Sequence, residues 1–183
     1  MIQESDLLTN LQTSEKKETA FRQLLAAYKE RLYWHVRRIV LDHDDADDVL
    51  QNTFIKVYRH IDSFKGDSKL YTWMYRIATN EALTFLKMKA RRNHITSQEV
   101  QRQAFSNLAS DIYFEGSAIQ LKLQQAIATL PEKQRLVFTM KYFGAHTYEE
   151  LSEILEISVG GLKSNYHIAV TKIKEFLAEN ETF

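Results

Sequence analysis

The sequence predicts an all-α protein of two small helical domains joined by a flexible linker. Only five of its 183 residues are Gly and one is Pro, whereas these two types together average roughly 12% of residues. So few turn formers do not suit a many-stranded sandwich or barrel, because each hairpin needs residues that tolerate special backbone angles. Apolar residues recur at intervals of three and four in several windows, which is the period of an amphipathic helix. The windows form two groups separated by a polar stretch.

The first group predicts a three-helix bundle over residues 18–92, after an N-terminal tail over residues 1–17. The second helix follows five Asp residues between Asp42 and Asp48, and acidic groups suit the first turn of a helix. The third runs from Leu70 into a basic cluster. The predicted apolar stripes are Phe21, Leu24, Leu25, Tyr28, Leu32, Val36 and Ile39 within residues 18–41, then Leu50, Phe54, Val57 and Ile61, then Leu70, Trp73, Met74, Ile77 and Ala78.

Residues 93–116 are the predicted linker, because the apolar period weakens there and Asn, Ser, Gln and Thr dominate. The segment is nevertheless richer in apolar residues than a purely solvated linker, which leaves open whether part of it docks on a domain or a partner. These residues are Phe105, Leu108, Ile112, Tyr113 and Phe114.

The second domain is predicted over residues 117–183 and ends in a helix-turn-helix. Thr147 with Glu150 three residues later fits a capping box, which starts a short helix over residues 148–155. Ser158 then caps a longer amphipathic helix, and two helices joined by a tight polar turn are typical of the motif. The expected core positions are Ile119, Leu123, Ile127 and Leu130, then Leu136, Val137, Met140 and Tyr142 before a stop at Gly144, then Leu162, Tyr166, Ala169, Val170, Ile173 and Leu177.

Composition excludes several classes of function. The absence of Cys removes disulfides, thiol nucleophiles and Cys-ligated zinc. The Asp-rich run from Asp42 departs from an EF-hand loop at Ala46, Asp47 and Thr53. No nucleophile elbow or Gly-rich phosphate loop occurs, so we expect no enzymatic activity, metal, cofactor or small-molecule substrate. No apolar run approaches the ~18 residues that span a bilayer, so we expect a cytoplasmic protein without membrane insertion.

Two basic surfaces point to nucleic acid, although the chain has a net charge of zero. The exposed face of the last helix has three Lys and no acid from Ile157 to Lys174, and such a helix suits the major groove. Near residues 64–76, aromatic residues lie among cations, the combination that stacks bases and pairs phosphates of a single strand. The alternatives are a solvated amphipathic helix at the first surface and core aromatic residues at the second.

Six motifs follow one another along both domains. The first half contains Asp47-Asp48-Val49-Leu50-Gln51-Asn52-Thr53-Phe54, then Phe64-Lys65-Gly66, then Trp73-Met74-Tyr75-Arg76-Ile77-Ala78-Thr79-Asn80. The second half contains Leu130-Pro131-Glu132-Lys133-Gln134-Arg135, then Thr147-Tyr148-Glu149-Glu150-Leu151, then Gly161-Leu162-Lys163-Ser164. In order and spacing they resemble bacterial RNA polymerase sigma factors of the extracytoplasmic-function type, which consist of little more than sigma regions 2 and 4 on a flexible link.

The resemblance implies an alternative sigma factor that binds core RNA polymerase and directs promoter-specific initiation, with an anti-sigma protein as a further partner. Region 2 would then be residues 18–92 and region 4 residues 117–183. The implied polymerase-binding residues are Asp48, Gln51, Asn52 and Ile55. The melted minus-ten strand would be bound by Lys65, Lys69, Tyr71, Trp73, Arg76, Asn80, Lys87, Arg91 and Arg92. The minus-thirty-five element would be bound by Thr147, Tyr148, Ser158, Lys163, Ser164, His167, Thr171 and Lys172.

Three positions of the last helix depart from the family pattern. Asn165 and Ile168 stand where the family often has Arg, and Gly161 stands where it has a β-branched residue. Fewer cations release fewer counterions, so the isolated second domain is expected to bind DNA weakly with a shallow salt dependence.

Two rival hypotheses remain from the sequence. A stand-alone helix-turn-helix regulator would bind an operator as a dimer, although no dimerisation helix or heptad seam is visible. A helical carboxylate enzyme would use the Asp cluster, and loss of activity after replacing Asp44 and Asp45 would identify it.

Overall fold

A computed structural model describes residues 4–106, 118–144 and 146–179, and these residues form helices without any strand. The helices are α1 (Glu4–Leu11), α2 (Lys17–Val40), α3 (His43–His60), the short 3-10 helix η1 (Ile61–Ser63), α4 (Leu70–Arg92), α5 (Ser97–Ser106), α6 (Ala118–Thr129), α7 (Glu132–Gly144), α8 (Tyr148–Leu155) and α9 (Val159–Glu179). The all-α prediction is therefore confirmed for the described part of the chain.

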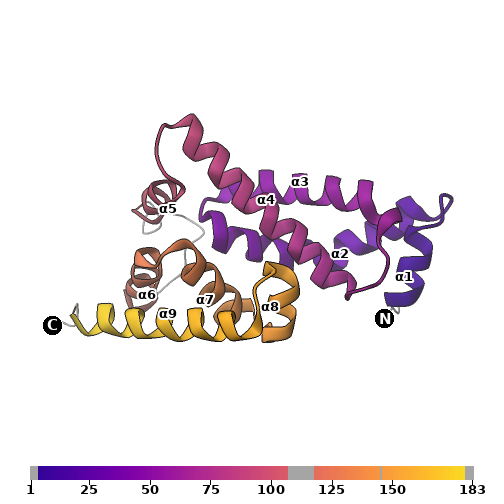
Figure 1. Cartoon of the computed structure of the whole chain (residues 1–183). Helices are drawn as coiled ribbons and strands as arrows, with labels where there is room; N and C mark the ends of the chain where they lie inside the picture. The colour runs from indigo at the N-terminus through magenta and orange to yellow at the C-terminus, as the bar shows by residue number, and fades with distance from the viewer. Residues whose placement is uncertain (1–3, 107–117, 145, 180–183) are drawn as a thin grey trace.

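Helices α2, α3 and α4 pack against one another as the first domain (Figure 1). Helix α2 ends at Leu41, whose φ of 68° lets its N–H bond back to the Arg37 carbonyl. Asp42 then caps α3, because its carboxylate accepts from the Asp45 N–H at 3.0 Å. Since α3 and α4 run in opposite directions, the acidic start of α3 meets the basic end of α4, where Lys89 pairs with Asp45.

The predicted N-terminal tail contains a helix. In α1 the side chains of Leu7 and Leu11 are buried, and Leu11 has no exposed surface. Both belong to the same hydrophobic core as α2, α3 and α4. Helix α1 is therefore a fourth element of the first domain, lying at one end of the molecule (Figure 1).

The predicted linker also begins with a helix, α5. Thr96 and Glu99 form reciprocal bonds at its start: the Thr96 N–H donates to Glu99 Oε2 at 2.6 Å, and the Glu99 N–H donates to Thr96 Oγ1 at 3.1 Å. Val100 is buried. Phe105 lies within α5, whereas Leu108, Ile112, Tyr113 and Phe114 lie outside the described residues. Part of this segment is thus docked on the first domain.

A buried polar bridge joins α5 to both domains. The Gln101 amide donates to the Ile39 carbonyl at 2.9 Å, and the Arg135 guanidinium donates to Gln101 Oε1. Arg135 also donates to the Leu130 carbonyl at 3.1 Å. Burial lowers the pKa of Arg135 to about 10, which leaves it charged near neutral pH. The buried cation is therefore satisfied by oxygen atoms from two elements of the fold.

Helices α6 to α9 form the second domain, with the predicted caps in place. Thr147 and Glu150 make the reciprocal bonds of a capping box at the start of α8, and Ser158 Oγ accepts from the Gly161 N–H at 3.2 Å. Two expected core residues differ: Ile119 is 79% exposed and Tyr142 is 56% exposed. Ile119 lies in the first turn of α6, so the elements that bury Ile127 do not cover it.

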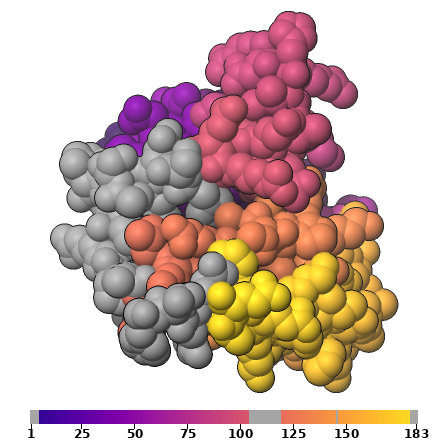
Figure 2. Space-filling model, turned by 90° about the vertical axis from the view of Figure 1, so that its left-hand side faces the viewer, coloured from indigo at the N-terminus to yellow at the C-terminus, as the bar shows by residue number. Residues whose placement is uncertain are grey.

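The two domains pack together. Val137, Met140, Leu151, Ile154 and Leu162 belong to one hydrophobic core with the buried residues of the first domain. Helix α8 packs on α4, and α7 packs on α2 (Figure 1). Seen from the end where the chain finishes, the end of α4 and helix α5 lie above the second domain, with the end of α9 below (Figure 2).

Candidate polymerase and nucleic-acid interfaces

The predicted polymerase-binding residues lie on the exposed face of α3. Asp48, Gln51 and Asn52 are exposed, and Ile55 keeps 42% of its surface accessible. Three of these four, with Asn52 the exception, line an open groove of about 700 Å³ between α2 and α3. With Phe54 and Tyr58, Ile55 gives the groove an exposed apolar surface among polar residues, a feature that marks protein-interaction sites.

Aromatic side chains form the floor of this groove. The Phe21 ring lies 4.9 Å from the Tyr58 ring and 6.4 Å from the Phe54 ring, both edge to face. Tyr58 is 40% exposed. Helix α2 therefore contributes to the candidate docking surface, which the sequence assigned to α3 alone.

Three of the predicted minus-ten residues, Lys65, Trp73 and Arg76, line a pocket of about 410 Å³, whereas Lys69 and Tyr71 do not line it. The Phe64 and Trp73 rings lie 5.1 Å apart, and the lining contains two cations, Lys65 and Arg76, and two carboxylates, Asp67 and Glu153. Gly66 has a φ of 77°, a conformation that glycine adopts without strain, and it turns the loop back toward α4. Aromatic faces beside cations are the combination that an unstacked base and its phosphate require.

Helix α8 of the second domain covers part of this surface. Arg76 pairs with Glu156, and Lys69 Nζ lies 3.5 Å from Glu150 Oε1. Glu153 lines the same pocket as Arg76. The acidic side of α8 thus lies beside two of the cations that are predicted to bind the minus-ten strand.

Tyr71 takes part in this contact through its hydroxyl. A hydrogen bond from the Tyr71 phenol, ahead of those from Thr147 and Lys69, lowers the pKa of Glu150 to about 2. Burial and the same carboxylate raise the pKa of Tyr71 to about 12. Near neutral pH the phenol is therefore a donor and the carboxylate an acceptor.

The remaining predicted minus-ten residues lie apart from the pocket. Lys87, Arg91 and Arg92 are exposed near the end of α4. At 1.5 Å per residue, Arg91 lies about 22 Å along the helix from Arg76. Asn80 is exposed one turn beyond Arg76. The structure thus separates a pocket from a distal basic segment.

A buried pair of imidazoles lies where the domains meet. His146 contacts the rings of Tyr75 at 4.9 Å, His35 at 6.4 Å and Tyr71 at 6.5 Å. Its Nε2 is buried without a hydrogen-bond partner among the described residues. A Cβ added at Gly144 would lie 2.6 Å from the His146 ring, so glycine permits this close approach. Burial lowers the pKa of His146, so it is neutral near pH 7.

The proton on His35 can be assigned from its neighbours. Thr79 Oγ1 donates to the Tyr75 carbonyl at 2.7 Å, so it accepts from His35 Nε2 at 2.9 Å. Burial, followed by the nearby His146 and Arg38, lowers the pKa of His35 from 6.5 to about 3. His35 is therefore neutral, with its hydrogen on Nε2.

The predicted minus-thirty-five residues form an exposed face along α8 and α9. Tyr148 is half-buried, with Lys141 Nζ at 4.9 Å and Lys163 Nζ at 5.7 Å from its ring centre. Ser158 is exposed and caps α9. The other members, all exposed, are Thr147, Lys163, Ser164, His167, Thr171 and Lys172.

Neither a metal centre nor a membrane span is found in the part of the chain that the structure describes. No group of three or more His, Asp or Glu side chains among the described residues could hold a metal ion. No described helix is both long and apolar enough to cross a bilayer.

Comparison with protein families identifies the two domains. Residues 24–92 match the family model described as Sigma-70 region 2, and residues 120–173 match Sigma-70, region 4. The chain belongs to the ECF sigma factors. It is 31% identical to the ECF RNA polymerase sigma factor SigW of Bacillus subtilis over 85% of this chain and 88% of the relative. It is 33% identical to the ECF RNA polymerase sigma-E factor of Escherichia coli K12 over 86% of this chain and 85% of the relative.

Solved structures confirm the fold of this sigma factor. One, described as CnrH in complex with the cytosolic domain of CnrY, has a TM-score of 0.69 at 21% identity and covers 96% of this chain and 97% of that chain. Another is the sigma factor RpoE in complex with the anti-sigma factor NepR from Bartonella quintana, with a TM-score of 0.66 at 21% identity over 88% of this chain and 98% of that chain. As a sigma factor, this protein directs transcription initiation by RNA polymerase and is not an enzyme.

Sequence reasoning about this sigma factor missed the acidic side of α8. Glu150 was identified as a capping residue and Glu149 only as part of a family motif, whereas Glu153 and Glu156 continue the same charge one and two turns later. That spacing of three to four residues is a signal for one charged helix face. The partners of this face lie about 80 residues earlier in the chain, so no local pattern could indicate them.

Proposed function

We propose that this sigma factor divides promoter recognition among three surfaces. The exposed face of α3 docks on core RNA polymerase, the pocket beside Trp73 holds an unstacked base of the minus-ten strand, and the exposed face of α9 binds the minus-thirty-five element. The observation that carries the proposal is the pocket itself, which combines two aromatic rings with Lys65 and Arg76. A base that finds such a pocket offsets part of the few kcal/mol lost on unstacking.

The free sigma factor is closed in this proposal. Glu150 and Glu156 hold Lys69 and Arg76, so DNA must displace these carboxylates before its phosphates can approach. Polymerase binding would separate the domains and expose both DNA-binding surfaces. The protein would act in the cytoplasm, where promoter DNA and polymerase are found.

An anti-sigma protein is the further partner that we propose. Both solved relatives are described as complexes, one of them with an anti-sigma factor. A partner that stabilises the closed arrangement of α4 and α8 would keep the sigma factor inactive. It would need little free energy for rearrangement, since the apolar contacts between the domains already exist.

Run-off transcription tests the proposed surfaces. Bacterial core polymerase is incubated with a barcoded promoter library, with and without the sigma factor, and new start sites are expected only in its presence. A Gln51→Ala, Asn52→Ala double variant is expected to lower polymerase affinity by about fivefold to tenfold, the effect of losing about 1 kcal/mol or slightly more at an interface. Unchanged affinity for polymerase would remove α3 from the docking surface.

A further inference from the structure

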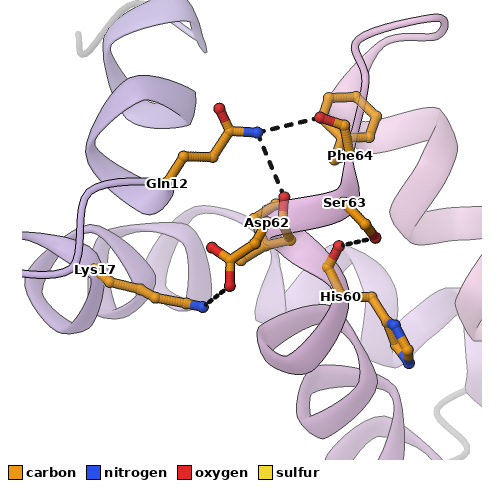
Figure 3. A network of polar contacts seen from close by, with 7 residues as sticks. Gln12, Lys17, His60, Asp62, Ser63 and Phe64 are labelled. Carbon is orange, nitrogen blue, oxygen red and sulfur yellow. Dashed lines mark hydrogen bonds and ion pairs between the residues drawn. The ribbon is translucent and has the colours of Figure 1, made fainter.

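The N-terminal segment reaches the base of the loop that lines the candidate base pocket (Figure 3). Leu7 and Leu11 anchor α1 in the core, and the chain then passes η1 before it enters α2. Two polar side chains from this passage, Gln12 and Lys17, point at η1 and the residue that follows it.

The Gln12 amide bridges two backbone carbonyls of this turn. Its Nε2 lies 3.1 Å from the Phe64 oxygen and 3.5 Å from the Ile61 oxygen. The Ile61 carbonyl already accepts from the Phe64 N–H at 3.1 Å, so the shorter Gln12 contact, to the Phe64 oxygen just beyond η1, is the main constraint on this turn. Gln12 makes these contacts across about 50 residues of sequence.

Lys17 holds the same turn from its outer side. Its Nζ lies 2.6 Å from Asp62 Oδ2 and 4.9 Å from the centre of the Tyr58 ring. The Asp62 side chain is 59% exposed, and an ion pair with an exposed partner contributes little. Gln12 is also exposed, but its bond is to the Phe64 backbone carbonyl, so it constrains the path of the loop more directly than the side-chain pair does.

The residue that Gln12 holds is a wall of the pocket. Phe64 is buried and packs on Trp73, and both line the 410 Å³ space together with Lys65 and Arg76. A shift of the Phe64 backbone also moves the Phe64 side-chain ring. The geometry of the pocket thus depends on a contact that lies outside it.

We infer that Gln12 is a positioning residue for the loop over residues 61–69, and that discrimination among minus-ten bases depends on it. The second part rests on the proposed function, because it requires that an unstacked base enters the pocket. The first part concerns the free protein alone. Gln12 would then influence promoter selectivity from outside the pocket.

Two substitutions at Gln12 test the inference. Gln12→Ala removes the amide, and Gln12→Glu keeps its shape but cannot donate to a carbonyl. The matched control is Thr13→Ala, because the Thr13 hydroxyl donates at 2.8 Å to the Thr9 carbonyl within the same segment. Hydrogen exchange of the free, full-length protein is expected to become faster over residues 61–69 in both Gln12 variants and to stay unchanged in the control.

The second measurement is base preference. Core polymerase with each variant transcribes a barcoded library randomised at the minus-ten element. In both Gln12 variants, the ratio of transcription from the preferred base to transcription from the other bases is expected to fall about fivefold, the factor that one typical hydrogen bond contributes. The preference is a ratio measured on one sample, so a smaller folded fraction does not change it.

Unchanged exchange over residues 61–69 in both Gln12 variants would overturn the positioning role. Faster exchange with unchanged preference would overturn its link to base discrimination. If the unsubstituted protein starts no transcripts, the proposed function fails and the link to base discrimination fails with it, while the exchange data still decide whether Gln12 holds the loop.

Discussion

Acidification is expected to destabilise this sigma factor through His35. The pKa of this imidazole is about 3 in the folded chain and about 6.5 in an unfolded one. Between these values the unfolded state binds the extra proton, so stability is fully present above pH 6.5 and falls as the pH decreases. Each pH unit costs about 1.4 kcal/mol, which gives a loss of about 2 kcal/mol between about pH 7 and about pH 5. Burial lowers the pKa of His146 as well, and its contribution has the same sign.

Urea unfolding followed by circular dichroism measures this loss at the two pH values. A His35→Gln variant cannot take up the proton, and its amide can still donate to Thr79. Its loss of stability on acidification is expected to be smaller than that of the unsubstituted protein by about 2 kcal/mol. His60→Gln is the control, because His60 is exposed at the end of α3.

An equal loss of stability in the unsubstituted protein and in His35→Gln would refute the reasoning. A direct test avoids any effect of the substitution on folding: the imidazole proton shifts of His35 in the unsubstituted protein should stay at their neutral values at about pH 5. Titration of His35 near pH 6.5 would mean that its burial does not exclude the charged form.

Three further predictions concern α8 and α9. Lys163→Ala should weaken promoter use and reduce the salt dependence of DNA binding by about one unit of slope, with unchanged affinity for core polymerase; equal loss of both would contradict the division of surfaces. Glu156→Gln should free Arg76 and raise the affinity of the isolated protein for a single-stranded minus-ten oligonucleotide up to about fivefold, the range of an exposed ion pair, as measured by fluorescence anisotropy; no increase would show that this carboxylate does not cover the site. Gly160→Ala should raise the free energy of unfolding by up to about 1 kcal/mol, because nothing lies within 4 Å of an added Cβ. Gly161→Ala should raise the free energy of unfolding by less, because its Cβ would lie 3.2 Å from side-chain atoms of Ile157 and Ser158. Chemical denaturation of the two variants measures the difference.

The helix-turn-helix was predictable because its signals are local. Thr147 and Glu150 lie three residues apart and bond to each other's backbone, so they specify the start of α8 without help from other elements. Ser158 does the same for α9. The buried apolar positions of α9 then determine which residues face solvent. The exposure of Lys163 and His167 therefore followed from the helical spacing of the apolar residues alone.

Helices α1 and α5 depend on tertiary contacts instead. Leu7 and Leu11 are one turn apart, which is too short a pattern to identify a helix in a polar segment, and they gain a partner only when the bundle provides one. Helix α5 is held through Gln101, whose partners belong to α2 and α7. Interactions across 34 and 62 residues leave no trace in local periodicity.

The candidate site was predictable in its residue types but not in its arrangement. Trp73 and Arg76 drew attention as an aromatic residue among cations, and the structure does place them around one pocket. The pairing of Arg76 with Glu156 depends on how the two domains pack. The division of the basic residues along α4 follows from the length of the helix, which carries Arg91 about 22 Å beyond Arg76.

Because the two domains share a hydrophobic core, their separation would expose apolar side chains to water. Leu151 and Ile154 of α8 are buried with residues of the first domain, and parting α8 from α4 would bring such side chains into contact with water. Hydration of apolar surface raises the heat capacity, whereas docking on polymerase lowers it by burying other apolar groups. The heat capacity change of polymerase binding, measured by calorimetry at several temperatures, should therefore be less negative the further the two domains open.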